Sequence, residues 1–181
     1  MTEGTLSVRK IVISGVLGAI SILLGWTRLG FIPVPTAAGH ATIMHVPAII
    51  GGIMEGWVVG GLVGLIFGLF SFLQATVPMF KDPLVAIVPR LFIGVTAYLT
   101  YAGLKRLNQY LALIVSATVG TLTNTLLVLG MAVVRGYMAP GVALTVAVTH
   151  GIPEIIVAAI ITVAVVVAWR QVEVGRGTAR M

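Results

Sequence analysis

The sequence predicts an all-α integral membrane protein, in which six transmembrane helices form one compact bundle with a long loop between the first two. Two observations support this fold class. Of the 181 residues, 59% are hydrophobic and only 9% are charged, whereas a soluble domain carries about 25% charged residues. The stretches 56–80 and 107–134 contain no charged residue, and each is longer than the roughly 20 apolar residues that span a bilayer.

Charged residues, prolines and glycines divide the chain into six expected spans, which together make a single transmembrane domain over residues 1–181. The spans cover about 9–26, 41–55, 57–79, 84–104, 109–134 and 141–169. Pro33 and Pro35 disfavour helix between residues 27 and 40. We therefore expect a long loop there, at a membrane face, where it could fold back over a cavity.

Lysine and arginine set the expected orientation, because cytoplasmic loops are enriched in them. With both termini in the cytoplasm, that side receives seven basic residues: Arg9, Lys10, Lys105, Arg106, Arg170, Arg176 and Arg180. The opposite side receives three: Arg28, Lys81 and Arg135. The chain is thus expected to be a multi-pass protein of the cell membrane with cytoplasmic termini. This scatter of basic residues also argues against nucleic-acid binding, despite the net charge of +6.

Small residues repeat on two of the expected spans. On the third span, glycines recur at every fourth position and should pack closely inside the bundle; they are Gly56, Gly60, Gly64 and Gly68. On the first span, Gly15 and Ala19 form one small-residue pair, and Ser14 and Gly18 form a second beside it. Two interpretations stay open for the first span: packing inside the bundle, or a groove that docks a helix of another membrane protein.

Four spans carry polar side chains at depths where such groups usually face the bundle interior or a water-filled cavity. These residues are Arg90, Asn124, His150 and Glu154, with Gln74 as a weaker fifth. A rise of about 1.5 Å per residue places all of them in the outer half of the membrane. The inner halves contain hydroxyls but no charge. This asymmetry predicts a binding pocket open to the outside rather than a channel or a proton relay.

Each of these side chains has more than one possible role. Arg90 offers a planar fork of donors that suits a ligand carboxylate. Glu154 could accept a hydrogen bond from a ligand, pair with Arg90 to join two helices, or act as an electrostatic gate. Asn124 could bind a ligand or a neighbouring helix.

The histidines are weaker candidates, because a lone histidine near a helix end is more often a cap or an interface residue. His40 and His45 are five residues apart, which does not place them on one helical face, and no nearby carboxylate completes a metal site. We expect neither a metal nor a cofactor. His150 and His40 remain candidates for contact with a polar ligand.

The chain lacks the motifs of the common hydrolases and of phosphate-binding loops: H-E-x-x-H, G-x-S-x-G and G-x-x-x-x-G-K-[ST]. It also lacks cysteine. We therefore expect a non-enzymatic protein that cannot hydrolyse ATP by the usual route. If it moves a solute against a gradient, another subunit or an ion must supply the energy.

Several phrases, taken in order, resemble the substrate-binding S components of energy-coupling factor (ECF) vitamin transporters. The phrases are GVLGAI, ATIMHVPAIIGGIMEG, GGLVGLIFGLFSF, DPLVAIVPRLFIG, GTLTNTLLVLG and HGIPEIIVAAII. The resemblance covers nearly the whole chain and implies a six-helix bundle that captures a water-soluble vitamin or related micronutrient from outside with high affinity.

The resemblance also implies partners and roles. The partners would be a transmembrane scaffold subunit and two ATP-binding-cassette ATPases, with Gly15 and Ala19 docking on the scaffold and the loop 27–40 acting as a lid. The substrate-binding role would fall on Arg90, Asn124 and Glu154. The phrases TIMHVPAIIGG and PLVAIVPR are most similar to the pantothenate and generic subgroup, and Arg90 would suit the carboxylate of pantothenate. Riboflavin would want more aromatic stacking than Trp26 and Phe31 offer, whereas folate, hydroxymethylpyrimidine, cobalamin and queuosine precursors remain open.

Two alternatives come from other functional classes. One is an intramembrane enzyme that uses Glu154 and His150 as acid and base, although it lacks a paired nucleophile or a metal set. The other is a small ion-coupled carrier or a self-assembling channel.

Overall fold

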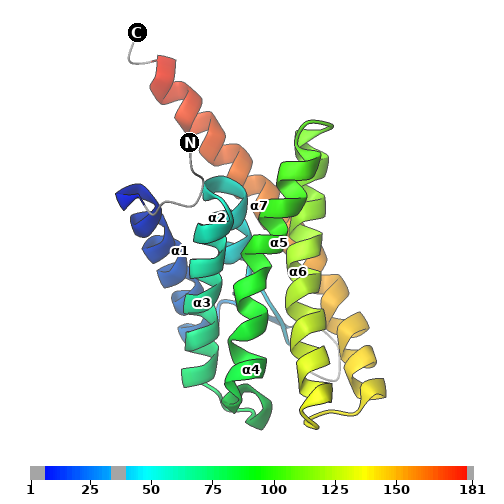
Figure 1. Cartoon of the computed structure of the whole chain (residues 1–181). Helices are drawn as coiled ribbons and strands as arrows, with labels where there is room; N and C mark the ends of the chain where they lie inside the picture. Colours follow the sequence, from blue (N-terminus) through cyan, green and yellow to red (C-terminus); the bar gives the residue numbers. More distant parts are fainter. Residues whose placement is uncertain (1–6, 34–39, 179–181) are drawn as a thin grey trace.

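The computed structural model describes residues 7–33 and 40–178, without the side chains of 40–41 and 173–178. Most of this part of the chain is helical, and the long helices pack side by side as a bundle (Figure 1). In chain order the elements are α1 (Val8–Trp26), β1 (Phe31–Pro33), β2 (His40–Thr42), α2 (Val46–Glu55), α3 (Trp57–Leu73), the 3-10 helix η1 (Pro78–Lys81), α4 (Pro83–Ala86), α5 (Val88–Leu104), α6 (Gln109–Val134) and α7 (Pro140–Thr178).

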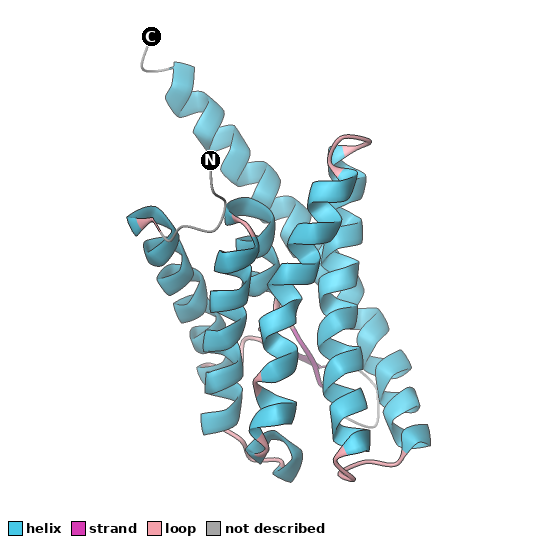
Figure 2. Ribbon diagram, in the orientation of Figure 1, coloured by secondary structure: helices cyan, strands magenta, loops and turns pink. Residues whose placement is uncertain are grey.

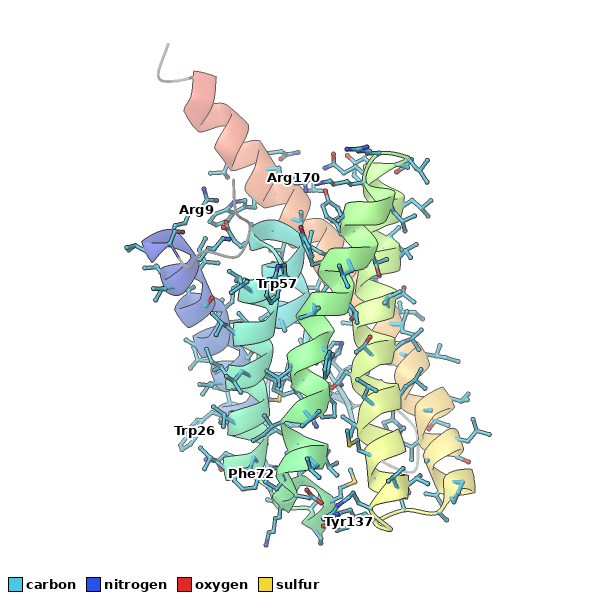
Figure 3. The ribbon with its side chains drawn as sticks, in the orientation of Figure 1. Arg9, Trp26, Trp57, Phe72, Tyr137 and Arg170 are labelled. Atoms are coloured by element: carbon cyan, nitrogen blue, oxygen red, sulfur yellow. The ribbon has the colours of Figure 1, made fainter. Side chains whose placement is uncertain are left out.

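The first and last helices fix the two ends of the bundle. α1 begins and α7 ends at the same end (Figure 1), which is marked by Arg9, Trp57 and Arg170 in Figure 3 and is called the terminal end below. The other, far end is marked by Trp26 and Tyr137. A chain that starts and finishes at one end has crossed the bundle an even number of times.

Four helical stretches in the described residues are long and apolar enough to cross a membrane: Val8–Trp26, Pro83–Leu104, Gln109–Val134 and Pro140–Val172. The second of them comprises α4 and α5. α2 has 10 residues and α3 has 17. At about 1.5 Å per residue, α2 covers roughly 15 Å, half of a bilayer core.

The sequence predicted a helix from residue 41, and this prediction is wrong: residues 40–42 form the strand β2. β2 pairs with β1 in an antiparallel hairpin with Phe31 opposite Thr42, visible midway along the bundle in Figure 2. The hairpin thus interrupts the expected loop 27–40, of which residues 34–39 lie outside the described part. α2 begins only at Val46, and Pro47 in its first turn suits a helix start.

Other helix bounds also differ from expectation. α3 ends at Leu73 instead of residue 79, since Pro78 starts a separate 3-10 turn. The fourth span is split at Ile87 into α4 and α5, next to Pro89, which cannot donate a backbone hydrogen bond. α7 continues past residue 169 to Thr178, because the polar tail consists partly of good helix formers.

Glycines bring α2, α3 and α5 into backbone contact. A Cβ placed on Gly60 would lie 2.8 Å from the Cα atoms of both Gly52 and Gly94, and one on Gly64 would strike the carbonyl of Arg90. Internal packing is therefore confirmed for the third-span glycines except Gly56. That residue has φ 101° in the turn between α2 and α3, a backbone conformation that favours glycine.

The two small-residue pairs of α1 have different environments. Ser14 and Gly18 are buried, and a Cβ on Gly18 would lie 2.6 Å from the Ile66 side chain of α3. Gly15 and Ala19 are exposed, and a Cβ on Gly15 would meet nothing within 4 Å. Internal packing is confirmed for the first pair, whereas the second remains available to a partner.

The backbone contact predicts that Gly94→Ala destabilises the bundle, because its added methyl would overlap the backbone of Gly60. Overpacking of this kind costs about 1–3 kcal/mol. The thermal unfolding of the detergent-solubilised protein would report it. Gly103→Ala is the matched control, since Gly103 is an exposed position of the same helix with open space around it. Equal unfolding temperatures for the two variants would contradict the contact.

Candidate functional site

Arg90 is a buried cation, and no carboxylate of the described residues lies on its guanidinium. It lies near the start of α5 and is 4% exposed. Its Nη1 donates to the carbonyl of Val85 at 2.5 Å, and its Cζ lies 5.4 and 5.0 Å from the ring centroids of Phe67 and Phe80. Among the described residues, its Nε has no hydrogen-bond partner. The charge is thus held by one carbonyl and two ring faces, which stabilise a cation less than a carboxylate does.

Glu154 joins the hairpin to two helices. On α7, its Oε1 accepts the backbone N–H of Thr42 in β2 at 2.7 Å, and its Oε2 accepts the hydroxyl of Thr125 in α6 at 3.5 Å. Glu154 and Arg90 interact electrostatically, but within the described residues no ion pair joins them directly. The alternative in which Arg90 and Glu154 pair to tie two helices therefore finds no support in the geometry.

His45 and Asn124 add two more buried polar groups. His45 is the N-cap residue of α2 and is fully buried; its Nε2 is 2.9 Å from the Thr121 hydroxyl of α6. Its Nδ1 and the Oδ1 of Asn124 have no hydrogen-bond partner in the described part of the chain. Thr121, Asn124 and Thr125 share one face of α6, since residues three and four apart are neighbours on a helix.

These groups form one polar cluster. Its members are Thr42, His45, Arg90, Thr121, Asn124, Thr125 and Glu154. Hydrogen bonds link Glu154 to Thr42 and Thr125 and His45 to Thr121, and Arg90 interacts electrostatically with Glu154 and His45. Asn124 belongs to it by its place beside Thr121 and Thr125 on α6. A buried polar atom without a partner costs about 1–3 kcal/mol, and such an atom in a native structure calls for an explanation such as a bound molecule. Chemically, the cluster can offer a polar ligand a cationic donor, an imidazole nitrogen and an amide oxygen.

The other predicted site residues lie at the edge of the cluster or apart from it. His150 is buried one helical turn before Glu154, with its Nδ1 3.0 Å from the hydroxyl of Thr149. Gln74 is exposed at the end of α3. His40 is the first residue of β2, and its side chain lies outside the described part. The sequence thus indicated three members of the cluster: Arg90, Asn124 and Glu154.

Sequence reasoning missed the role of His45 and of the threonines. His45 directly precedes an apolar helix start, a position that suggests a cap, yet its partner Thr121 is 76 positions away. The spacing of Thr121, Asn124 and Thr125 in TLTNT was an available signal for a polar helix face. Thr42 contributes a backbone amide, which side-chain chemistry cannot indicate.

Comparisons with known proteins agree with this architecture. A family model described as "ECF transporter, substrate-specific component" matches residues 9–166. The pantothenic acid transporter PanT of Lactococcus lactis subsp. cremoris (strain MG1363) is 32% identical, over 70% of this chain and 76% of the relative. A solved structure, described as that of the S component of a bacterial ECF transporter, aligns with a TM-score of 0.59 at 20% identity, over 91% of this chain and 95% of the other. That likeness establishes a shared fold.

The buried hydrogen bond between His45 and Thr121 predicts that Thr121→Val destabilises the protein by about 1–3 kcal/mol, because the imidazole is left buried without that partner. Thr118→Val is the matched control: it makes the same change on the same helix, where the hydroxyl bonds only to the carbonyl of Ile114. Unfolding in mixed detergent micelles would measure both variants. A Thr121→Val variant as stable as Thr118→Val would contradict the proposed cost.

Proposed function

The chain belongs to the family of ECF transporter substrate-specific components, and we propose that the vitamin it captures is pantothenate. Family membership makes it a substrate-binding subunit of a transporter rather than an enzyme. It thereby argues against the intramembrane acid–base enzyme and the self-assembling channel considered from the sequence. The polar cluster is the proposed binding site.

The burial of Arg90 and its lack of an anionic partner within the described residues are the main support for pantothenate as the ligand. The guanidinium is buried, and within the described part of the chain it has no carboxylate on it and no partner for its Nε. Such a group is suited to a ligand that brings its own anion. Pantothenate has a carboxylate, an amide and two hydroxyls. The carboxylate would fit Arg90, and the amide and hydroxyls would fit the free atoms of His45 and Asn124. The likeness to a pantothenic acid transporter supports the same vitamin.

We place the terminal end of the bundle in the cytoplasm, so that one domain crosses the membrane six times. The excess of basic residues expected at that end supports this orientation. The hairpin and α2 together would make the second crossing, since α2 alone covers about half of a bilayer. The hairpin of β1 and β2 would then cover the cluster from outside, held through Thr42 by Glu154.

A transmembrane scaffold subunit and two ATP-binding-cassette ATPases are the proposed partners. The exposed pair Gly15 and Ala19 would be the scaffold-docking face of α1, because small residues allow a second helix to approach closely. The other small pair of α1 is occupied by internal packing. The cell membrane is the proposed location.

Removing the charge of Arg90 tests the vitamin and its orientation together. Arg90→Met keeps much of the side-chain volume and should weaken pantothenate binding by about 2 kcal/mol, roughly 30-fold. Binding of pantothenol, in which an alcohol replaces the carboxylate, should change little. Titration calorimetry of the purified chain measures both affinities. Equal losses would assign Arg90 to the fold, and a wild-type chain that binds no pantothenate would overturn the choice of vitamin.

Filling the small-residue face tests docking. Replacing both Gly15 and Ala19 by leucine should abolish vitamin uptake in cells that contain the scaffold and ATPases, while the purified variant still binds the vitamin. Gly130→Leu is the control, because Gly130 is an exposed glycine of α6 with open space around it, and uptake should persist. Loss of vitamin binding in the double variant would instead place the pair in the packing of the bundle.

A further inference from the structure

The segment 78–86, which comprises η1 and α4 at the far end, covers the guanidinium of Arg90. Phe80 from η1 presents its ring 5.0 Å from Arg90 Cζ. Val85 from α4 presents its carbonyl to Nη1 and is fully buried. Two residues of this segment therefore contact Arg90 directly, so any shift of the segment changes both the orientation of the guanidinium and its shielding from water.

Asp82 lies between those two residues and ties the segment to another part of the chain. Its Oδ1 accepts the N–H of Leu84 at 3.0 Å and so caps the start of α4. Its Oδ2 accepts the Nε–H of Arg135 at 2.6 Å and the hydroxyl of Tyr137 at 3.5 Å. Both of these donors belong to the connection between α6 and α7. One carboxylate thus fixes the helix start and anchors it to the neighbouring connection.

The apolar contacts of the segment cannot fix its position as closely. Val85 and Phe80 pack in a small cluster with residues of α6 and the α6–α7 connection, and three of its members are methionines: Met79, Met131 and Met138. Methionine is flexible and adapts to irregular gaps, whereas an ion pair with a direct hydrogen bond is directional. The hydrogen bond from Arg135 also lowers the pKa of Asp82 below its ordinary value of 3.8, so the carboxylate stays ionised at neutral pH.

We propose that Asp82 and Arg135 are positioning residues for the Arg90 site: their ion pair holds the segment 78–86 over the guanidinium. The pair acts on the ligand only through Phe80 and Val85. The Asp82 carboxylate is buried and Arg135 is half-exposed, and their contacts lie at the far end, so the effect is local to this end of the bundle. The effect of the pair on ligand affinity rests on the proposed function. Its effect on how the segment 78–86 covers Arg90 does not.

Because the chain has no cysteine, a single introduced thiol can report how well the segment 78–86 is shielded from water. Ala86 is fully buried in α4, so a single thiol from Ala86→Cys should react slowly with a charged, membrane-impermeant thiol reagent. Adding Asp82→Asn or Arg135→Gln should raise the reaction rate at least tenfold. Asparagine still caps a helix, so the first variant removes the ion pair and keeps the cap.

Glu55→Gln is the matched control for thiol labelling. It removes the ion pair with Arg9 at the terminal end and should leave the labelling rate of Ala86→Cys unchanged. Unchanged labelling in both Asp82→Asn and Arg135→Gln would overturn the positioning role, whichever ligand the protein binds.

Ligand binding tests the same role without a cysteine. Asp82→Asn should weaken pantothenate at least fivefold and pantothenol by less than twofold, although Asp82 touches neither ligand. In the Arg90→Met background, Asp82→Asn should cause no further loss of pantothenate affinity, because the pair acts through Arg90. Equal losses for both ligands, or additive losses with Arg90→Met, would overturn the proposal. If the wild-type chain binds no pantothenate, the proposed vitamin fails while the labelling experiment still decides the role of the pair.

Discussion

The burial of the Arg90 guanidinium is the constraint on which the rest of the site depends. An arginine inside a membrane is costly unless neighbouring groups compensate it. Here the compensation comes from the Val85 carbonyl, two aromatic faces and the more distant charge of Glu154. None of these is a hydrogen-bonded carboxylate. The folded protein therefore retains an unmet preference for an anion, which a ligand can satisfy.

Glycine is concentrated on α3 where that helix meets the backbone of α5. The backbone of Arg90 touches Gly64, and the next contact along α5 is between Gly94 and Gly60. Backbones this close leave little freedom at the start of α5, so the guanidinium leaves the helix from a fixed point. The position of the guanidinium can then be adjusted only through the segment 78–86, which covers Arg90 from the far end. Prolines begin both helices of this segment, and Asp82 caps the second.

The hairpin solves a second problem of burial. Backbone groups that are neither in a helix nor in contact with water must find partners inside the protein. β1 and β2 satisfy part of this requirement by pairing with each other, and Glu154 accepts the amide of Thr42. A carboxylate after a proline in an apolar helix thereby has a structural role: it accepts one hydrogen bond from the hairpin and one from Thr125 of α6.

How far the sequence could predict these features differs between the fold and the site. Composition and charge spacing predicted a helical membrane bundle, and glycine spacing predicted the packing of α3, because these properties are local or periodic. The motif resemblance predicted the family. The hairpin could not be predicted, since Pro33 signals only an irregular segment and strand pairing depends on chain folding. His45 was undervalued for a similar reason: its hydrogen bond to Thr121 exists only once α2 lies against α6.

A structure of the protein with pantothenate bound would test most directly whether Arg90 binds the carboxylate of the vitamin. We expect the carboxylate of the vitamin to lie within about 2.7–2.9 Å of the Arg90 guanidinium nitrogens, with the rest of the molecule between His45 and Asn124. A vitamin bound elsewhere, or one that turns its carboxylate away from Arg90, would contradict this expectation.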